Sequence, residues 1–170
     1  MMDKNDKDAI YYNEEKLTVF DLALEKKIEE LCLWAAARAA AVVVLPFVGT
    51  CALIANEVYL IKKIGDLHEQ KLSETVILGF IASLGASVVG GTLATLLPYS
   101  PTKIVIGATI TYGLGKAAHE WLKAGRPDDI EIFKKVFSEV KTDIKKNIKA
   151  VLNHPDGNKP LGDENKKFNN

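Results

Sequence analysis

The chain has 170 residues, enough for one domain with a substantial core. Its 22 basic and 22 acidic residues cancel, which argues against a general nucleic-acid binder, because such proteins need a strongly positive surface. The two cysteines, Cys32 and Cys51, are too few for a disulfide framework and do not have metal-ligand spacing. We therefore expect a reducing compartment.

The N-terminal sequence is acidic and lacks the apolar stretch of a secretory signal peptide. We expect residues 1–13 to form a polar segment, followed by a single helical domain over residues 14–153. Its first helix is predicted over residues 14–33, because apolar residues recur there at steps of three and four. That face holds Leu17, Phe20, Leu24, Ile28 and Leu31, and the opposite, charged face holds Glu25, Lys26, Glu29 and Glu30.

A second segment begins at Trp34 with a run of alanines and continues to Lys63. Between Arg38 and Glu57 lie 18 uncharged residues, close to the length that crosses a bilayer. Pro46 and Gly49 interrupt this stretch, and proline removes a backbone donor, so a helix break is predicted there. Either a kinked membrane span or two short helices joined by a tight turn satisfies the pattern. The alanines favour close helix packing over contact with lipid.

The third segment is uncharged from Thr75 to Thr102 and is long enough to span a membrane. A helix is predicted over residues 79–97, with small residues at four-residue intervals along one broad groove, as in a glycine zipper. The alternative is a central helix that is buried on all sides in a soluble bundle. The predicted packing groove consists of Gly79, Ser83, Ser87 and Gly91 beside Ala82, Ala86, Gly90 and Ala94.

Two further helices are predicted towards the C-terminus. The first follows a proline turn, with Pro101 in its first turn and Gly125 as its C-cap. The second is a basic amphipathic helix over residues 128–153, whose apolar stripe and flanking lysines suit the outer helix of a bundle or a membrane surface. Residues 154–170 lack periodicity and are rich in turn formers, so a disordered tail is predicted. The fold class expected is all-α: a helical bundle around a small-residue-rich apolar hairpin.

No catalytic, cofactor-binding or metal-binding residues are predicted. The sequence TYGLGKAAHE is close to a phosphate-binding loop, but Ile110 and Ala117 occupy the positions that need glycine and a hydroxyl residue. Glycines that pack one helix against its neighbour explain this motif better. The three histidines have no partners at metal-ligand spacing and are expected at the surface: His68, His119 and His154. Glu57 is interpreted as an interfacial helix end, with a functional intramembrane carboxylate as the alternative.

A resemblance to a known family rests on two pieces. One is the helix WAAARAAAVVVLPFVG, which runs from Trp34 into a proline-glycine break, and the other is ATITYGLGKAAHEWL after a proline turn. Over residues 34–123 the chain resembles the helical domain of unknown function 697 that often accompanies Era-like GTPases in bacteria. The resemblance implies an all-helical, membrane-associated module without catalytic residues. It also implies that any nucleotide role would come from a GTPase partner.

The function expected from these patterns is that of a non-enzymatic, membrane-associated module that anchors or recruits a partner, such as a GTPase or further copies of itself. Membrane lipid is an expected partner and nucleic acid is not. The location expected is a bacterial inner membrane with both termini in the cytoplasm, with a cytoplasmic protein as the alternative. Two other functions fit the same patterns: a pore-forming or membrane-perturbing protein, and a soluble bundle with an apolar ligand pocket.

Overall fold

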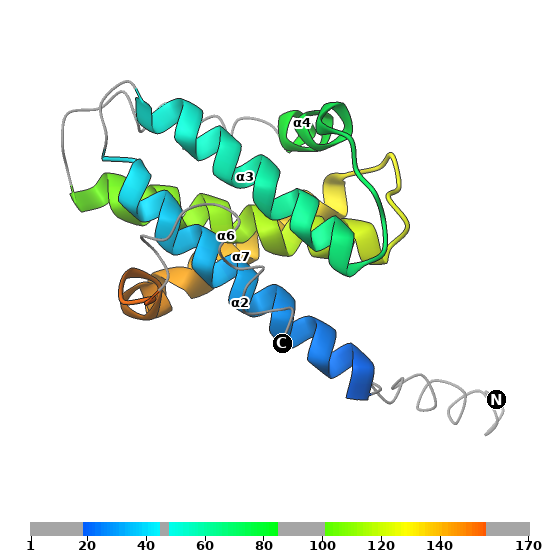
Figure 1. The fold of residues 1–170 in the computed structure, drawn as a ribbon, viewed down its shortest axis with the longest axis horizontal. Helices are drawn as coiled ribbons and strands as arrows, with labels where there is room; N and C mark the ends of the chain where they lie inside the picture. Colours follow the sequence, from blue (N-terminus) through cyan, green and yellow to red (C-terminus); the bar gives the residue numbers. More distant parts are fainter. Residues whose placement is uncertain (1–18, 45–47, 85–100, 156–170) are drawn as a thin grey trace, which may run out of the picture.

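The computed structural model describes residues 19–44, 48–84 and 101–155 (Figure 1). Within these ranges the chain forms helices and their connections and contains no strand, which confirms the all-α prediction for the part described. The helices are α2 (Val19–Val42), α3 (Val48–Leu67), α4 (Glu74–Ser83), α6 (Pro101–Lys123) and α7 (Glu131–Leu152). The predicted segment 1–13 and almost all of the predicted tail 154–170 lie outside the described ranges.

Helix α6 is the centre of the described bundle, since it packs against α2, α3 and α7 (Figure 1). Helix α2 runs antiparallel to α6 and also contacts α3, while the short α4 lies beside α3. Phe80 of α4 also stacks on Trp121 of α6, with ring centroids 4.5 Å apart. The sequence led us to expect the helix after Gly79 at the centre, whereas among the described helices this position belongs to α6. The main core includes Ile28, Leu31, Leu60, Ile64, Leu114, Leu122, Phe133 and Phe137.

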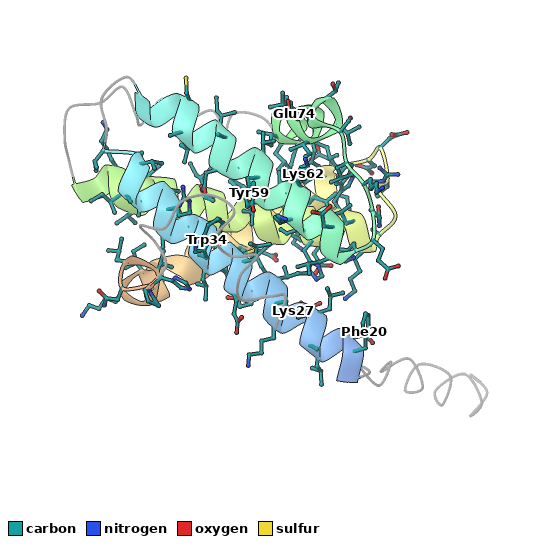
Figure 2. All side chains as sticks on the ribbon, in the orientation of Figure 1. Phe20, Lys27, Trp34, Tyr59, Lys62 and Glu74 are labelled. Atoms are coloured by element: carbon teal, nitrogen blue, oxygen red, sulfur yellow. The ribbon has the colours of Figure 1, made fainter. Side chains whose placement is uncertain are left out.

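Helix α2 continues through the boundary predicted at residue 33 and ends at Val42. The reason is local, because alanine has the highest helix propensity and no breaker occurs before Pro46. The same alanines pack tightly, as predicted: Ala36, Ala37 and Ala40 form a small cluster with Ala108 of α6. At the other end of α2, which extends beyond the other described helices, Phe20 is 72% exposed, so its predicted core position is wrong (Figure 2).

The break predicted at Pro46 and Gly49 is present as two separate helices. Helix α2 ends at Val42 and α3 begins at Val48, which places Gly49 in the first turn of α3. Pro46 itself lies outside the described residues. In the described residues, none of the helices combines the length and the apolarity that crossing a bilayer requires. Because α2 and α3 are separate helices, the chain follows the two-helix interpretation at this point.

Helix α4 covers the beginning of the long uncharged run. Ser73 caps it, because the Ser73 side chain accepts a hydrogen bond from the backbone N–H of Val76 at 3.3 Å. The helix ends at Ser83, and residues 85–100 lie outside the described ranges. The prediction of one continuous helix over residues 79–97 is therefore wrong at Ser83, where α4 ends with Leu84 as its C-cap, and its remainder lies outside the described residues.

The observed ends of the last two helices lie within three residues of the predicted ones. Helix α6 begins at Pro101, and Gly125 follows its end with φ +80°, a conformation in which glycine has no steric penalty. Helix α7 begins at Glu131, three residues after the predicted start. Phe133 and Phe137 of its apolar stripe are buried in the core, so α7 packs as an outer helix of the bundle.

Candidate functional site: a polar network along helix α6

The predicted small-residue groove is only partly described. Of its eight members, Gly79, Ala82 and Ser83 belong to α4, whereas Ser87, Gly91, Ala86, Gly90 and Ala94 lie outside the described residues. A Cβ atom added at Gly79 would meet no atom within 4 Å, so no described helix approaches it closely. Helix α4 packs through its other face, which carries Ile77 and Phe80. The groove as a whole stays a prediction.

The TYGLGKAAHE motif is a packing surface in the middle of α6. All of its residues are helical, and Ile110 and Ala117 are buried in the core. A Cβ atom at Gly113 would lie 3.0 Å from the ring of Phe137 in α7, and one at Gly115 would lie 2.5 Å from Sγ of Cys32 in α2. The two glycines therefore allow neighbouring helices to approach α6, which confirms the packing interpretation of the motif.

The polar residues of the same motif bind the acidic side of α2. Tyr112 donates its hydroxyl hydrogen bond to Glu29 over 2.5 Å, and the Lys116 ammonium lies 3.3 Å from the other oxygen of the same carboxylate. The prediction that Glu25 and Glu29 belong to a charged face opposite the core is thus wrong. Both carboxylates face α6, because α2 and α6 meet along a seam that includes this side of α2.

A chain of three hydrogen-bonded side chains continues this seam. His119 Nε2 lies 2.8 Å from the carboxylate of Glu25, and His119 Nδ1 lies 2.9 Å from Nε2 of His68. His119 is only 1% exposed, so its predicted surface position is wrong. His68 follows the end of α3 and is half-buried. The chain therefore joins α2, α6 and the end of α3.

The charges and hydrogen bonds around Glu25, His119 and His68 favour an ionised Glu25. Burial alone would raise the pKa of Glu25, but the hydrogen bond and charge of His119, with Lys116 and Lys123, outweigh it and lower the pKa below 4.5. A carboxylate at this position accepts a hydrogen bond from His119 Nε2–H, which leaves Nδ1 to face His68. This is the arrangement in which an acidic group orients one imidazole and that imidazole orients a second.

A second polar group is buried between α3 and α6. Glu57 is 2% exposed and accepts a long hydrogen bond, 3.5 Å, from the hydroxyl of Thr111. Burial raises the pKa of Glu57 from 4.5 to about 7, against the lowering effect of Thr111. The neighbouring Asn56 is also buried and donates to the backbone carbonyl of Ala35 over 2.9 Å. Glu57 is therefore an interior carboxylate in the bundle, which corrects its interpretation as an interfacial helix end.

The contact between α2 and α3 near Asn56 is reinforced by aromatic and cationic side chains. Arg38 donates to the Asn56 side-chain oxygen over 3.3 Å, and its guanidinium lies 5.1 Å from the centre of the Trp34 ring. The Trp34 and Tyr59 rings are 6.1 Å apart, one from each helix (Figure 2). These contacts hold the polar residues of α3 against α2.

The sequence contained a signal for this network that single-helix patterns do not register. Glu25 and Glu29 are four residues apart on one helix, and Tyr112, Lys116 and His119 share a face of another. A row of acidic residues on one helix and a row of hydrogen-bond donors on another, both at helical spacing, predict a polar contact between the two helices. In the described ranges, no cluster of three or more His, Cys, Asp or Glu residues has the arrangement of a metal site.

The chain was compared with curated proteins, protein-family models and solved structures. Over 94 residues the chain is 33% identical to Magnetosome membrane protein 22 of Magnetospirillum gryphiswaldense. That match covers 55% of this chain and 47% of the relative, so the chain spans about half the length of the curated relative that it matches. No protein-family model matches the chain, and no solved structure matches it, so the resemblance to the domain of unknown function 697 stays a prediction. The chain is thus similar, over about half of its length, to a magnetosome membrane protein.

Proposed function

We propose that this chain is a non-enzymatic helical module that attaches to a membrane through α4 and the uncharged run after it, and that recruits a protein partner there. The observation that carries the proposal is the exposed face of α4. Val76 is 40% exposed and Leu78 is 46% exposed, beside exposed Gly79 and Ala82. Val76 and Leu78 are two residues apart, so they lie at the two edges of the exposed face with Gly79 and Ala82 between them. An exposed apolar face without charge is typical of an interaction surface.

The sequence around α4 favours lipid as the occupant of this surface. After Glu74 no charged residue occurs up to Thr102, so the exposed face belongs to a long apolar stretch of chain. An amphipathic helix that lies in a membrane interface buries such a face among the acyl chains. The similarity to a protein named for the magnetosome membrane supports the same occupant.

The polar network supports a structural role for the residues that could otherwise carry chemistry. Lys116 and Tyr112 bind Glu29, and His119 binds both Glu25 and His68. Each of these groups connects two elements of the bundle. The resemblance to the helical domain that accompanies Era-like GTPases supports a GTPase as the class of partner that the module recruits.

Vesicle flotation tests the membrane part of this proposal. The purified chain is mixed with vesicles of equal parts phosphatidylcholine and phosphatidylglycerol, and the floating fraction is measured for the wild type and for Val76→Glu/Leu78→Glu. Each half-exposed apolar side chain contributes about 1 kcal/mol on burial in lipid, so the double variant should bind at least tenfold more weakly. Ile132→Glu, at a 66% exposed position on α7, is the matched control and should bind as the wild type does.

A wild-type chain that stays entirely in the aqueous fraction would contradict membrane attachment. Equal loss of binding in the control variant would place the lipid contact elsewhere than on α4. Release of a dye trapped in the vesicles would replace attachment by membrane perturbation, which is the alternative function. Recruitment is tested separately, by flotation of a purified Era-like GTPase with vesicles that carry the chain.

A further inference from the structure

The chain Glu25–His119–His68 ties the segment after α3 to the centre of the bundle. His68 is the first residue after α3, and its Nε2 reaches His119 of α6 over 2.9 Å. Two residues later, the side-chain amide of Gln70 donates to the carbonyl of Leu122 over 3.1 Å. These two contacts hold the connection between α3 and α4 against the C-terminal part of α6.

The geometry limits the number of protons that the three side chains Glu25, His119 and His68 can carry. His119 Nε2 faces the Glu25 carboxylate at 2.8 Å and therefore bears hydrogen. Between His119 Nδ1 and His68 Nε2, only one of the two nitrogens can bear the hydrogen of their shared bond. The histidine pair can therefore hold one positive charge with the bond intact. A second proton would place two N–H groups against each other and two imidazolium ions in contact.

We propose that the Glu25–His119–His68 chain is a pH-sensitive clasp that holds the segment from His68 to α4 against α6 and opens when both histidines become protonated. The clasp consists of these three side chains. The proposal concerns the bundle itself and is independent of attachment to a membrane.

The charges that act on the clasp come from α2 and α6. Helix α2 contributes Glu25, and α6 contributes Glu120, whose carboxylate lies 3.7 Å from His119 Nε2, and Lys123, whose ammonium lies 3.7 Å from Glu25. The charge of Lys116, which also lies in α6, lowers the pKa of Glu25, and Lys116 is itself paired with Glu29. Burial, followed by the charge of His119, lowers the pKa of His68; Glu25 and Glu120 raise it and Lys123 lowers it. The net direction is downward from 6.5, so the folded protein favours neutral His68.

The sign of the pH dependence follows from this direction. A group whose pKa is lowered by folding stabilises the closed form above its unfolded value, and this stabilisation is lost as the pH falls below that value. For His68 the loss begins near pH 6.5, the ordinary value of histidine. Opening takes up one additional proton, so its equilibrium should increase by up to tenfold for each pH unit below this point.

Apart from the clasp and the Gln70 hydrogen bond, the segment is attached through apolar side chains that are buried in the main core: Leu72, Ile77, Phe80 and Leu84. Helix α4 makes few contacts with α3, and Phe80 stacks on Trp121 of α6. Helix α4 also has only 10 residues, which is too short for stability in isolation. Opening of the clasp should therefore lower the protection of residues 68–84, while α2 and α6 keep their mutual contacts.

Hydrogen exchange measured by mass spectrometry between pH 7.5 and pH 5 tests the clasp. After correction for intrinsic exchange rates, protection of residues 68–84 should fall at least tenfold between these pH values. Protection of α2 and α6 should change by less than threefold. A smaller fall in residues 68–84, or an equal fall in all helices, would overturn the proposal, and this measurement needs only the wild-type chain.

Two variants separate the clasp from other effects of acid. His68→Gln cannot be protonated, and its side-chain amide can donate to a neutral His119 Nδ1 or, after rotation, accept from a protonated one. Protection of residues 68–84 should therefore lose most of its pH dependence. His154→Gln removes a histidine outside the clasp and should behave as the wild type does. A His68→Gln chain that folds and keeps the wild-type pH response would overturn the proposal. If that variant does not fold, the wild-type measurement tests the proposal by itself. Protection of residues 68–84 that does not fall with pH would then overturn it.

Discussion

Gly115 provides a sharp test of the close contact between α2 and α6. A Cβ atom at this position would lie 2.5 Å from Sγ of Cys32 and 3.1 Å from Cδ2 of Leu60. Ordinary contacts of this kind are 3.4–4 Å, so Gly115→Ala forces α2 away by about 1 Å or rotates buried side chains. Overpacking of a well-packed core costs about 1–3 kcal/mol.

A matched control removes the effect of helix propensity from this measurement. Alanine stabilises a helix relative to glycine by about 0.8–1 kcal/mol, which would partly offset the clash at Gly115. Gly79→Ala makes the same chemical change in α4, where an added Cβ atom meets nothing within 4 Å. We therefore expect Gly79→Ala to be up to about 1 kcal/mol more stable than the wild type, and Gly115→Ala to be about 1–3 kcal/mol less stable than Gly79→Ala.

The free energy of unfolding is measured by urea denaturation followed by circular dichroism at pH 7. For a chain of this size, each kcal/mol corresponds to about 2–4 °C in Tm, which gives a second readout. Cys32→Ala removes the sulfur and leaves the Cβ of residue 32 at 3.5 Å, an ordinary contact. The double variant Cys32→Ala/Gly115→Ala should therefore lose less stability than the sum of the single variants. Equal stability of Gly115→Ala and Gly79→Ala would refute the close approach of the two helices.

Three further predictions concern other parts of the bundle. Since folding raises the pKa of Glu57 from 4.5 to about 7, its protonated form stabilises the fold below pH 4.5, and this contribution is lost as the pH rises to 7. Glu57→Gln should therefore be more stable than the wild type at pH 8, by up to about 3 kcal/mol, with no such advantage at pH 4, in urea denaturation at both pH values. Ser73→Ala should remove the cap of α4 and cost about 1 kcal/mol, seen as faster hydrogen exchange in α4, whereas Ser73→Asp should preserve its protection. The isolated chain should not bind GTP, because Ile110 and Ala117 are buried in a continuous helix, and micromolar binding in calorimetry would contradict this.

Much of the local structure was predictable from the sequence, because the signals involved act within one helix. Pro101 and Gly125 mark the ends of α6, since proline suits the first turn and glycine suits the positive φ after the last. The apolar stripe of α7 places Phe133 and Phe137 in the core, since the helical period alone puts them on one face. The glycines of the α6 motif were correctly interpreted as packing positions for the same reason.

The polar network was not predictable in the same way, because it depends on which helices meet. The period of α2 separates an apolar face from a charged one, but only the antiparallel contact with α6 brings Glu25 and Glu29 against His119 and Lys116. Burial of His119 likewise depends on the position of His68 after α3, 51 residues away in the chain. Sequence by itself determined the all-helical class and the ends of α6, which are set by short-range backbone and side-chain preferences, but it did not determine where α2 and α4 end. The tertiary structure decided which charged residues became interior ones, because a buried polar group is stable only where a partner from another helix satisfies it.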